Sequence, residues 1–267
     1  MCHFANMSMK TSILKTENLY IGYTSKKGTI NIASNINIEL EAGKLITLIG
    51  GNGIGKSTLL KTITSIIPAL EGQVYLSDKK IAEYSPESLA QNLSIVTTEK
   101  LPASNLTVSE LIALGRHPYT NWMGNLTETD LNHIEEAIKI TNISHLQYKK
   151  YSEISDGQLQ KVMIARALAQ DTPLIILDEP TTHLDLFHKV AVFKLLKKLA
   201  NENNKCILFS THDIDLAIQL SDEMIVMTED FCVQDQPCNL IEKGVFDTLF
   251  KDEHIVFDKT YGKFIVR

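Results

Sequence analysis

The feature that most constrains this chain is a glycine-rich stretch at residues 50–58, with the sequence Gly50-Gly51-Asn52-Gly53-Ile54-Gly55-Lys56-Ser57-Thr58. Two glycines separated by four residues, then Lys and Ser, form the pattern of a phosphate-binding loop. Glycine lets the main chain come close to a ligand, and successive backbone N–H groups then form a concave nest for phosphate oxygens. We expect Lys56 to reach the β- and γ-phosphates of a nucleoside triphosphate and the Ser57 hydroxyl to ligate Mg²⁺.

The segments on either side of this stretch favour the same interpretation. Residues 45–49 are an apolar, β-rich run, which is typical of a buried parallel strand. After the loop, apolar residues recur at helical spacing until Pro68 ends the pattern; they are Leu59, Leu60, Ile63, Ile66 and Ile67. A strand, a glycine-rich turn and a helix are the setting that a phosphate loop requires, whereas a merely flexible turn needs neither flank. A helix that begins near Lys56 would add the positive end of its dipole.

Length, charge and cysteine content limit the class of protein. The 267 residues suffice for one large α/β domain or a domain with a subdomain. The net charge of −6, with Lys and Arg scattered along the chain, argues against nucleic acid as a partner. No run approaches the roughly 18 apolar residues that cross a bilayer, and the N-terminus lacks a secretion-signal pattern. The four cysteines lack the spacing of a metal site, so we expect free thiols, with Cys206 buried.

The pattern along the chain predicts an α/β fold with two additions. Residues 13–40 alternate apolar and polar positions, which predicts antiparallel strands with one solvated face. Residues 101–151 are mainly helical, and capping-box spacing at Thr107 and Thr127 marks two helix starts. Strands and helices then alternate again, and the tail at 254–266 has the pattern of a hairpin.

Two carboxylates end a second apolar strand, at residues 174–177. Oxygen ligands suit Mg²⁺, so Asp178 is a candidate to hold that ion through its water shell. Glu179, the next residue, can orient and deprotonate an attacking water. Adjacent acids at a strand end are common surface residues, but beside a phosphate loop they predict nucleotide hydrolysis.

Further segments resemble the ATP-binding-cassette (ABC) ATPases. Residues 154–158, Ile-Ser-Asp-Gly-Gln, are similar to the LSGGQ signature of that family, with Ile154 for Leu and Asp156 for the first Gly. Residues 182–185 resemble its D-loop, and residues 210–213 resemble its switch-histidine loop. Each segment alone has a structural explanation, such as a Ser N-cap before a helix. Together with the phosphate loop and Tyr23, however, these segments occur along the chain in the same order as the motifs of the family.

The resemblance implies a P-loop NTPase of ABC type, with a mixed central sheet, an antiparallel β subdomain and an inserted helical subdomain. It implies one ABC ATPase domain over 11–267, divided into a catalytic core at 11–98 and 152–230, a helical subdomain at 99–151 and a C-terminal extension at 231–267. In this family two such subunits close head to tail over two ATP molecules.

The resemblance also implies roles for individual residues. Tyr23 would stack on adenine, Glu179 would be the catalytic base, and His212 would hold the γ-phosphate. Catalysis would also use Lys56, and Mg²⁺ would be held by Ser57 and Asp178. The signature residues Ser155, Gly157 and Gln158 would act on the ATP of the second subunit. The phosphates would be bound by Gly50, Asn52, Gly53, Gly55, Lys56, Ser57 and Thr58.

The chain departs from the family at the Q-loop, where a Gln normally follows the strand at 93–96. Here Thr98 occupies that position and Glu99 follows it. A hydroxyl is shorter than an amide and makes a weaker contact to Mg²⁺ through water. Either Glu99 takes over the role of the Gln, or ATP hydrolysis is coupled to transport through a different geometry.

Residues 106–119 are similar to the corresponding segment of importer ATPases for iron–siderophore, haem and cobalamin. In that family this face docks membrane subunits, so we expect permease subunits to bind near 99–125 and the chain to lie on the cytoplasmic face of the plasma (inner) membrane. The predicted function is ATP hydrolysis in an ABC importer for a ferric siderophore or related chelate, with haem or cobalamin as alternative cargo. A soluble ABC ATPase of DNA repair or translation would need a long coiled coil or a second cassette, and a P-loop kinase would leave the signature unexplained.

Overall fold

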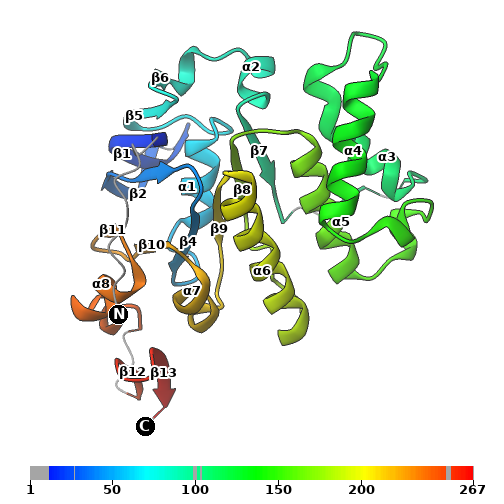
Figure 1. Cartoon of the computed structure of the whole chain (residues 1–267). Helices are drawn as coiled ribbons and strands as arrows, with labels where there is room; N and C mark the ends of the chain where they lie inside the picture. The colour runs from blue at the N-terminus through cyan, green and yellow to red at the C-terminus, as the bar shows by residue number, and fades with distance from the viewer. Residues whose placement is uncertain (1–11, 27, 99–100, 103, 251–253, 267) are drawn as a thin grey trace.

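A six-stranded sheet, in the order β11-β10-β4-β9-β8-β7, forms the centre of the molecule (Figure 1). Its strands are β4 (Leu45–Gly50), β7 (Leu93–Val96), β8 (Leu174–Leu177), β9 (Cys206–Ser210), β10 (Glu223–Met227) and β11 (Cys232–Asp235). The strands run parallel except β11, which pairs antiparallel with β10. Strands β8 and β9 are buried along their whole length, which explains why they are apolar throughout except for Ser210 at the end of β9. The computed structural model describes residues 12–26, 28–98, 101–102, 104–250 and 254–266.

Different layers cover the two faces of this sheet. Ile46 and Leu48 of β4 pack with an antiparallel sheet and α1 (Lys56–Ile63), while Leu45 and Ile49 pack with α5 (Asp156–Ala169) and α6 (Leu186–Asn203). The alternation along β4 thus separates two hydrophobic cores. The antiparallel sheet contains β1 (Ser12–Ser25), β2 (Gly28–Ile36), β3 (Glu39–Glu41), β5 (Glu71–Leu76) and β6 (Lys79–Lys80). The predicted fold class, including these antiparallel strands, is confirmed.

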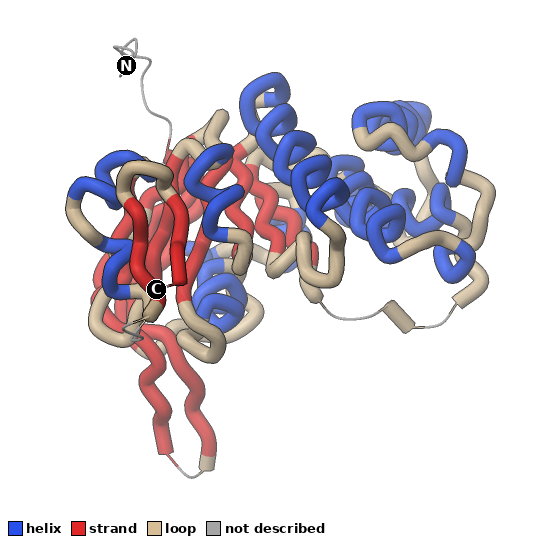
Figure 2. Tube along the Cα trace, turned by 90° about the horizontal axis from the view of Figure 1, so that it is seen from below, coloured by secondary structure: helices blue, strands red, loops and turns tan. Residues whose placement is uncertain are grey.

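A group of helices lies to one side of the sheets (Figure 2). It contains α3 (Val108–Ala113), α4 (Glu128–Ile140) and the 3₁₀ segments η2 (Leu114–Tyr119), η3 (Ser144–Leu146) and η4 (Tyr151–Glu153). Both predicted capping boxes are present, at Thr107 with Glu110 and at Thr127 with Asp130. They satisfy backbone N–H groups that would otherwise lack partners at the helix starts. The 3₁₀ segment η1 (Ile81–Glu83) packs against β5, and α2 (Pro86–Ala90), which is capped by Ser85, contacts both β7 and η2.

The end of the chain forms a small aromatic cluster beside the main body. Its elements are α8 (Pro237–Glu242), η5 (Val245–Thr248), β12 (Ile255–Asp258) and β13 (Lys263–Val266), and β13 packs on α7 (Ile214–Leu220), which connects β9 to β10. The predicted hairpin is confirmed, because β12 and β13 pair antiparallel. Phe257 stacks on Phe246 with ring centroids 4.8 Å apart, and its other neighbour is Phe264. Within the described residues, no helix is both long and apolar enough to span a bilayer.

The helix after the phosphate loop is shorter than the sequence predicted. Periodicity indicated a helix through Ile67, but α1 ends at Ile63 and Thr64 is its C-cap. Ser65 has a φ of 60°, a left-handed conformation that stops the helix. Pro68 also disfavours helical backbone at the residue before it. The prediction was wrong here because the apolar spacing of Ile66 and Ile67 continued past a local backbone reversal.

Candidate active site

The phosphate-loop residues lie where β4 ends and α1 begins, at the carboxyl edge of the parallel strands. Ligands of open α/β sheets bind at this edge. Gly55 has a φ of 110°, and a Cβ built there would lie 2.4 Å from Ile32 Cγ2. At Gly50 a Cβ would lie 2.4 Å from the carbonyl oxygen of Met227. Glycine is therefore required at both positions by close packing, and at Gly55 by backbone conformation as well.

Lys56 lies almost fully buried beneath the loop. Its Nζ donates to the carbonyl oxygens of Gly50 and Gly51, at 3.0 and 3.1 Å. Burial lowers the pKa of Lys56, and the nearby carboxylates Glu179 and Asp178 oppose that shift. Lys56 is thus held in one position at the lining of the pocket over the loop, where a charged donor suits an anionic ligand.

A pocket of about 330 Å³ opens over the loop and combines several of the predicted residues. Tyr23 of β1 lies at its wall, where its hydroxyl is 2.9 Å from Thr58 Oγ1. The ring of Tyr23 is half exposed, as a platform for a stacked base must be. The pocket is lined by Tyr23, Ile32, Asn52, Gly53, Gly55, Lys56, Ser57, Thr58 and Glu179.

Asp178 and Glu179 follow β8 and are held in place by Ser210 at the end of β9. The Ser210 hydroxyl donates to Asp178 Oδ1 at 2.7 Å and accepts from the backbone N–H of Glu179 at 2.8 Å. Glu179 has a φ of 46°, which is strained for a residue with a side chain and is a frequent property of active-site backbones. Ser210 begins the segment that resembles the switch-histidine loop, but its contact with the acidic pair was not predicted; its place at a strand end, directly before Thr211 and His212, was the signal that could have found it.

His212 and Glu179 meet at the same edge of the sheet. His212 Nε2 lies 2.8 Å from Glu179 Oε1, and Thr182 Oγ1 donates to Glu179 Oε2 at 3.0 Å. Both carboxylate oxygens of Glu179 therefore have a fixed neighbour, which orients the group toward the loop pocket that it lines. Such a carboxylate can accept a proton from a water placed against a terminal phosphate.

The signature residues lie outside this pocket. Ser155 caps α5, accepting the backbone N–H of Gln158 at 3.3 Å, while Gln158 Oε1 accepts the N–H of Ser155 at 3.0 Å. Ser155, Gly157 and Gln158 are absent from the residues that line the loop pocket of this chain. The structure thus brings together the loop, Tyr23 and Glu179, with Asp178 and His212 next to them. The signature residues of the same chain are not part of this group.

Thr98 lies two residues beyond β7 and is exposed. Strand β7 borders the acidic pair directly, because the Asp178 backbone N–H donates to the Val96 carbonyl at 2.8 Å. Glu99, the other residue predicted to replace the missing Gln, lies outside the described residues.

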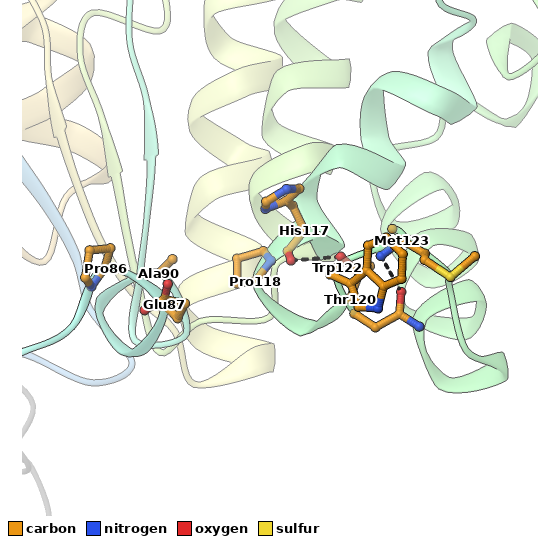
Figure 3. Close-up of a pocket in the computed structure, with 10 residues that line it drawn as sticks. Pro86, Glu87, Ala90, His117, Pro118, Thr120, Trp122 and Met123 are labelled. Atoms are coloured by element: carbon orange, nitrogen blue, oxygen red, sulfur yellow. Dashed lines mark hydrogen bonds between the residues drawn. The ribbon is translucent and has the colours of Figure 1, made fainter.

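A second hollow lies between α2 and the segment that follows η2 (Figure 3). Its volume is about 710 Å³, and Trp122 at its rim is 93% exposed. Gln91 bridges its two walls, since Gln91 Nε2 donates to the Pro118 carbonyl at 3.0 Å. The hollow is lined by Pro86, Glu87, Ala90, His117, Pro118, Thr120, Asn121, Trp122, Met123 and Gly124.

Comparison with known proteins places this geometry in context. The family model described as "ABC transporter" matches residues 33–182. An uncharacterized ABC transporter ATP-binding protein of Methanocaldococcus jannaschii is 40% identical over 253 residues, which covers 94% of this chain and 86% of the relative. The iron(3+)-hydroxamate import ATP-binding protein of Bacillus subtilis is 39% identical over 252 residues, covering 94% and 92%.

Solved structures resemble most of the chain. An inward-facing structure described as a metal-chelate type ABC transporter has a TM-score of 0.77 and 25% identity, covering 92% of this chain and 90% of that one. A dimeric bacterial ABC transporter cassette has a TM-score of 0.72 and 26% identity, covering 84% and 98%.

Proposed function

We infer that this chain, which belongs to the ABC transporter family of ATP-binding proteins, powers an importer for ferric siderophores or related metal chelates by hydrolysing ATP. The observation that carries the chemistry is the Glu179 carboxylate, held by His212 and Thr182 at the wall of the phosphate-loop pocket. The cargo is inferred from the relatives, among which is the iron(3+)-hydroxamate import protein of Bacillus subtilis.

Residues in and beside the loop pocket have separate roles in hydrolysis. Backbone N–H groups of the loop and Lys56 bind the phosphates, and Tyr23 stacks on the adenine. Glu179 accepts the proton of the attacking water, and His212 orients Glu179 and contacts the γ-phosphate. Oxygen donors at Ser57 and Asp178 fit Mg²⁺, which prefers such ligands. The bound ion would neutralise developing charge on the phosphates.

A second copy of the chain completes the site in this proposal. The exposed Ser155 and the half-buried Gly157 of the signature lie outside the loop pocket of their own chain, and the resembling cassette was solved as a dimer. ATP bound between two subunits contacts the closed dimer more than the open one, which is what drives a conformational change.

The hollow beside Trp122 is the proposed contact with a permease. An almost fully exposed Trp next to a hollow of about 710 Å³ is typical of an interface, because such side chains gain most from burial. The chain would then lie on the cytoplasmic face of the membrane.

We also propose that the chain is divided into a catalytic core (11–98, 152–230), a helical subdomain (99–151) and a C-terminal extension (231–267).

Growth on defined iron sources tests the proposed function. A strain that lacks this subunit should fail to grow with a ferric hydroxamate siderophore as its iron source, yet it should grow normally on haem iron and still take up cobalamin. The wild-type gene should restore growth on the siderophore. Trp122→Ala should restore it poorly, although the purified variant hydrolyses ATP at the normal rate. Normal growth of the deletion strain on every ferric siderophore would overturn the cargo assignment, and full rescue by Trp122→Ala would overturn the docking site.

We propose that Thr98 and Glu99 form the site that stands where the family has its Gln, and the part of Thr98 can be tested separately. Thr98→Ala should reduce the amount of chelate transported per ATP hydrolysed by about 10-fold, because loss of coupling between two sites typically changes function 5–150-fold. Thr98→Ser, which keeps the hydroxyl, is the matched control and should retain coupling. Equal stoichiometry in Thr98→Ala and wild-type vesicles would remove Thr98 from the coupling route.

A further inference from the structure

The first turn of α6 lies against the segment that resembles the signature. Gly157 faces the His188 imidazole so closely that a Cβ built on it would lie 3.1 Å from His188 Cδ2. Asp185 orients the ring, because its Oδ1 lies 2.9 Å from His188 Nδ1. His188 therefore fills the space beside Gly157 and limits how far the start of α5 can move toward α6.

The next residue of the same turn reaches the loop of His212. Lys189 Nζ donates to Asp213 Oδ1 at 2.6 Å, and the other oxygen of that carboxylate accepts from Thr181 Oγ1 at 2.8 Å. Asp213 directly follows His212, and Thr181 lies two residues after Glu179. Lys189 thus ties both segments of the catalytic pair to α6 through one charged network.

Neither contact is needed to form α6 itself. Asp185 Oδ1 already accepts the backbone N–H of His188 at 2.9 Å as the N-cap, so the imidazole is not required for capping. Lys189 pairs with a residue on another element, whereas Lys198 of the same helix pairs with Glu202 one turn away. Both His188 and Lys189 therefore serve contacts outside their own helix.

We infer that the first turn of α6 is a rigid link between the two ATP sites of a dimer, in which His188 positions Gly157 and Lys189 positions His212. This inference rests on the proposed function, where Gly157 serves ATP bound by the second subunit and His212 serves ATP of its own. Because His188 and Lys189 are adjacent on one rigid helical turn, a shift of the His212 loop at one site moves the signature at the other. The two ATP sites are then energetically coupled.

The test compares His188→Ala and Lys189→Met with Lys198→Met, a matched control that removes an exposed ion pair from the same helix. Hydrolysis by the full-length subunit is measured against ATP concentration, and nucleotide affinity by fluorescence titration. We expect the Hill coefficient, near 2 for the wild type and the control, to fall toward 1 in both test variants. Their kcat should fall about 10-fold or more, since small misplacements of catalytic groups are costly. The Kd for ATP should change less than about twofold, because the phosphate loop is untouched.

Further variants distinguish a link from a loss of packing. His188→Phe keeps a ring beside Gly157 and should recover most of the kcat lost in His188→Ala. A wild-type Hill coefficient near 1 would overturn the link. So would His188→Ala and Lys189→Met enzymes that match Lys198→Met in both kcat and Hill coefficient.

Mixed dimers separate this inference from the proposed function. With Glu179→Gln in one subunit, only ATP bound by the other subunit is hydrolysed. Ser155→Ala in the Glu179→Gln subunit should lower that rate, and no loss there would overturn the composite site itself. If Ser155→Ala does lower the rate, then His188→Ala should also lower it when placed in the Glu179→Gln subunit, and Lys189→Met should lower it when placed in the active subunit. If instead His188→Ala lowers the rate only in the active subunit and Lys189→Met only in the Glu179→Gln subunit, the link is overturned and the composite site stays intact.

Discussion

Replacing Glu179 by Gln is expected to lower the kcat of ATP hydrolysis by a factor of about 10²–10⁴, the usual contribution of a positioned general base. The amide has nearly the same shape as the carboxylate and can keep a hydrogen bond to Thr182, so the pocket should retain its geometry. It cannot accept the proton of the attacking water. ATP binding should therefore remain, because Lys56 and the loop backbone are unchanged.

Two measurements check this prediction on the purified subunit. Steady-state phosphate release gives kcat, and titration with a fluorescent ATP analogue gives the Kd, which should stay within about threefold of the wild-type value. Glu202→Gln is the matched control, because Glu202 lies on the exposed side of α6 in an ion pair with Lys198. Hydrolysis at the wild-type rate by Glu179→Gln would show that another group takes the proton, and the assignment of Glu179 would be wrong.

The parts of the site that depend on local sequence could be predicted. The phosphate loop is one continuous stretch between a strand and a helix, and its glycines are required by contacts of the loop itself. Asp178 and Glu179 were identified because an apolar strand immediately precedes them. Both capping boxes were predicted for the same reason, since each is complete within four residues.

Contacts between distant segments could not be predicted. Ser210 meets Asp178 only because β9 lies beside β8, an order of strands that the sequence does not state. Lys189 and Asp213 are 24 residues apart, and neither belongs to a recognisable pattern with the other. The end of α1 was missed because a single reversed residue, Ser65, outweighed the apolar periodicity around it.

The buried ion pair of Arg116 and Asp130 was also invisible in the sequence, and it supports the largest expected effect on stability. Arg116 Nε donates to Asp130 Oδ1 at 2.8 Å, with the two side chains only 5% and 4% exposed. Arg116 also donates to the Ala169 carbonyl at the end of α5 and stacks on the Tyr119 ring at 3.9 Å. One side chain thus joins η2, α4 and α5, directly before His117 and Pro118 of the proposed docking hollow.

Arg116→Met is expected to lower the free energy of unfolding by about 3–5 kcal/mol, because it leaves the Asp130 carboxylate buried without its cation. The double variant with Asp130→Asn should recover much of this loss, since the amide oxygen can still accept from Thr127. Lys139→Met, which breaks an exposed pair with Glu135 on α4, should change the free energy by less than about 0.5 kcal/mol. Urea unfolding at pH 7 provides all of these values.

The same pair predicts how stability depends on pH. Burial alone would raise the pKa of Asp130, but hydrogen bonds from Thr127 and Arg116 outweigh it and hold the pKa at about 2, below the ordinary 3.8. A depressed carboxylate pKa stabilises the folded state above the ordinary value, and this stability is lost as pH falls toward the folded value. The stability difference between the wild type and Arg116→Met should therefore be constant from pH 7 to about 5 and shrink between about 4 and 2. A difference below about 1 kcal/mol at pH 7, or one that does not shrink in acid, would mean that the ion pair does not hold these helices together.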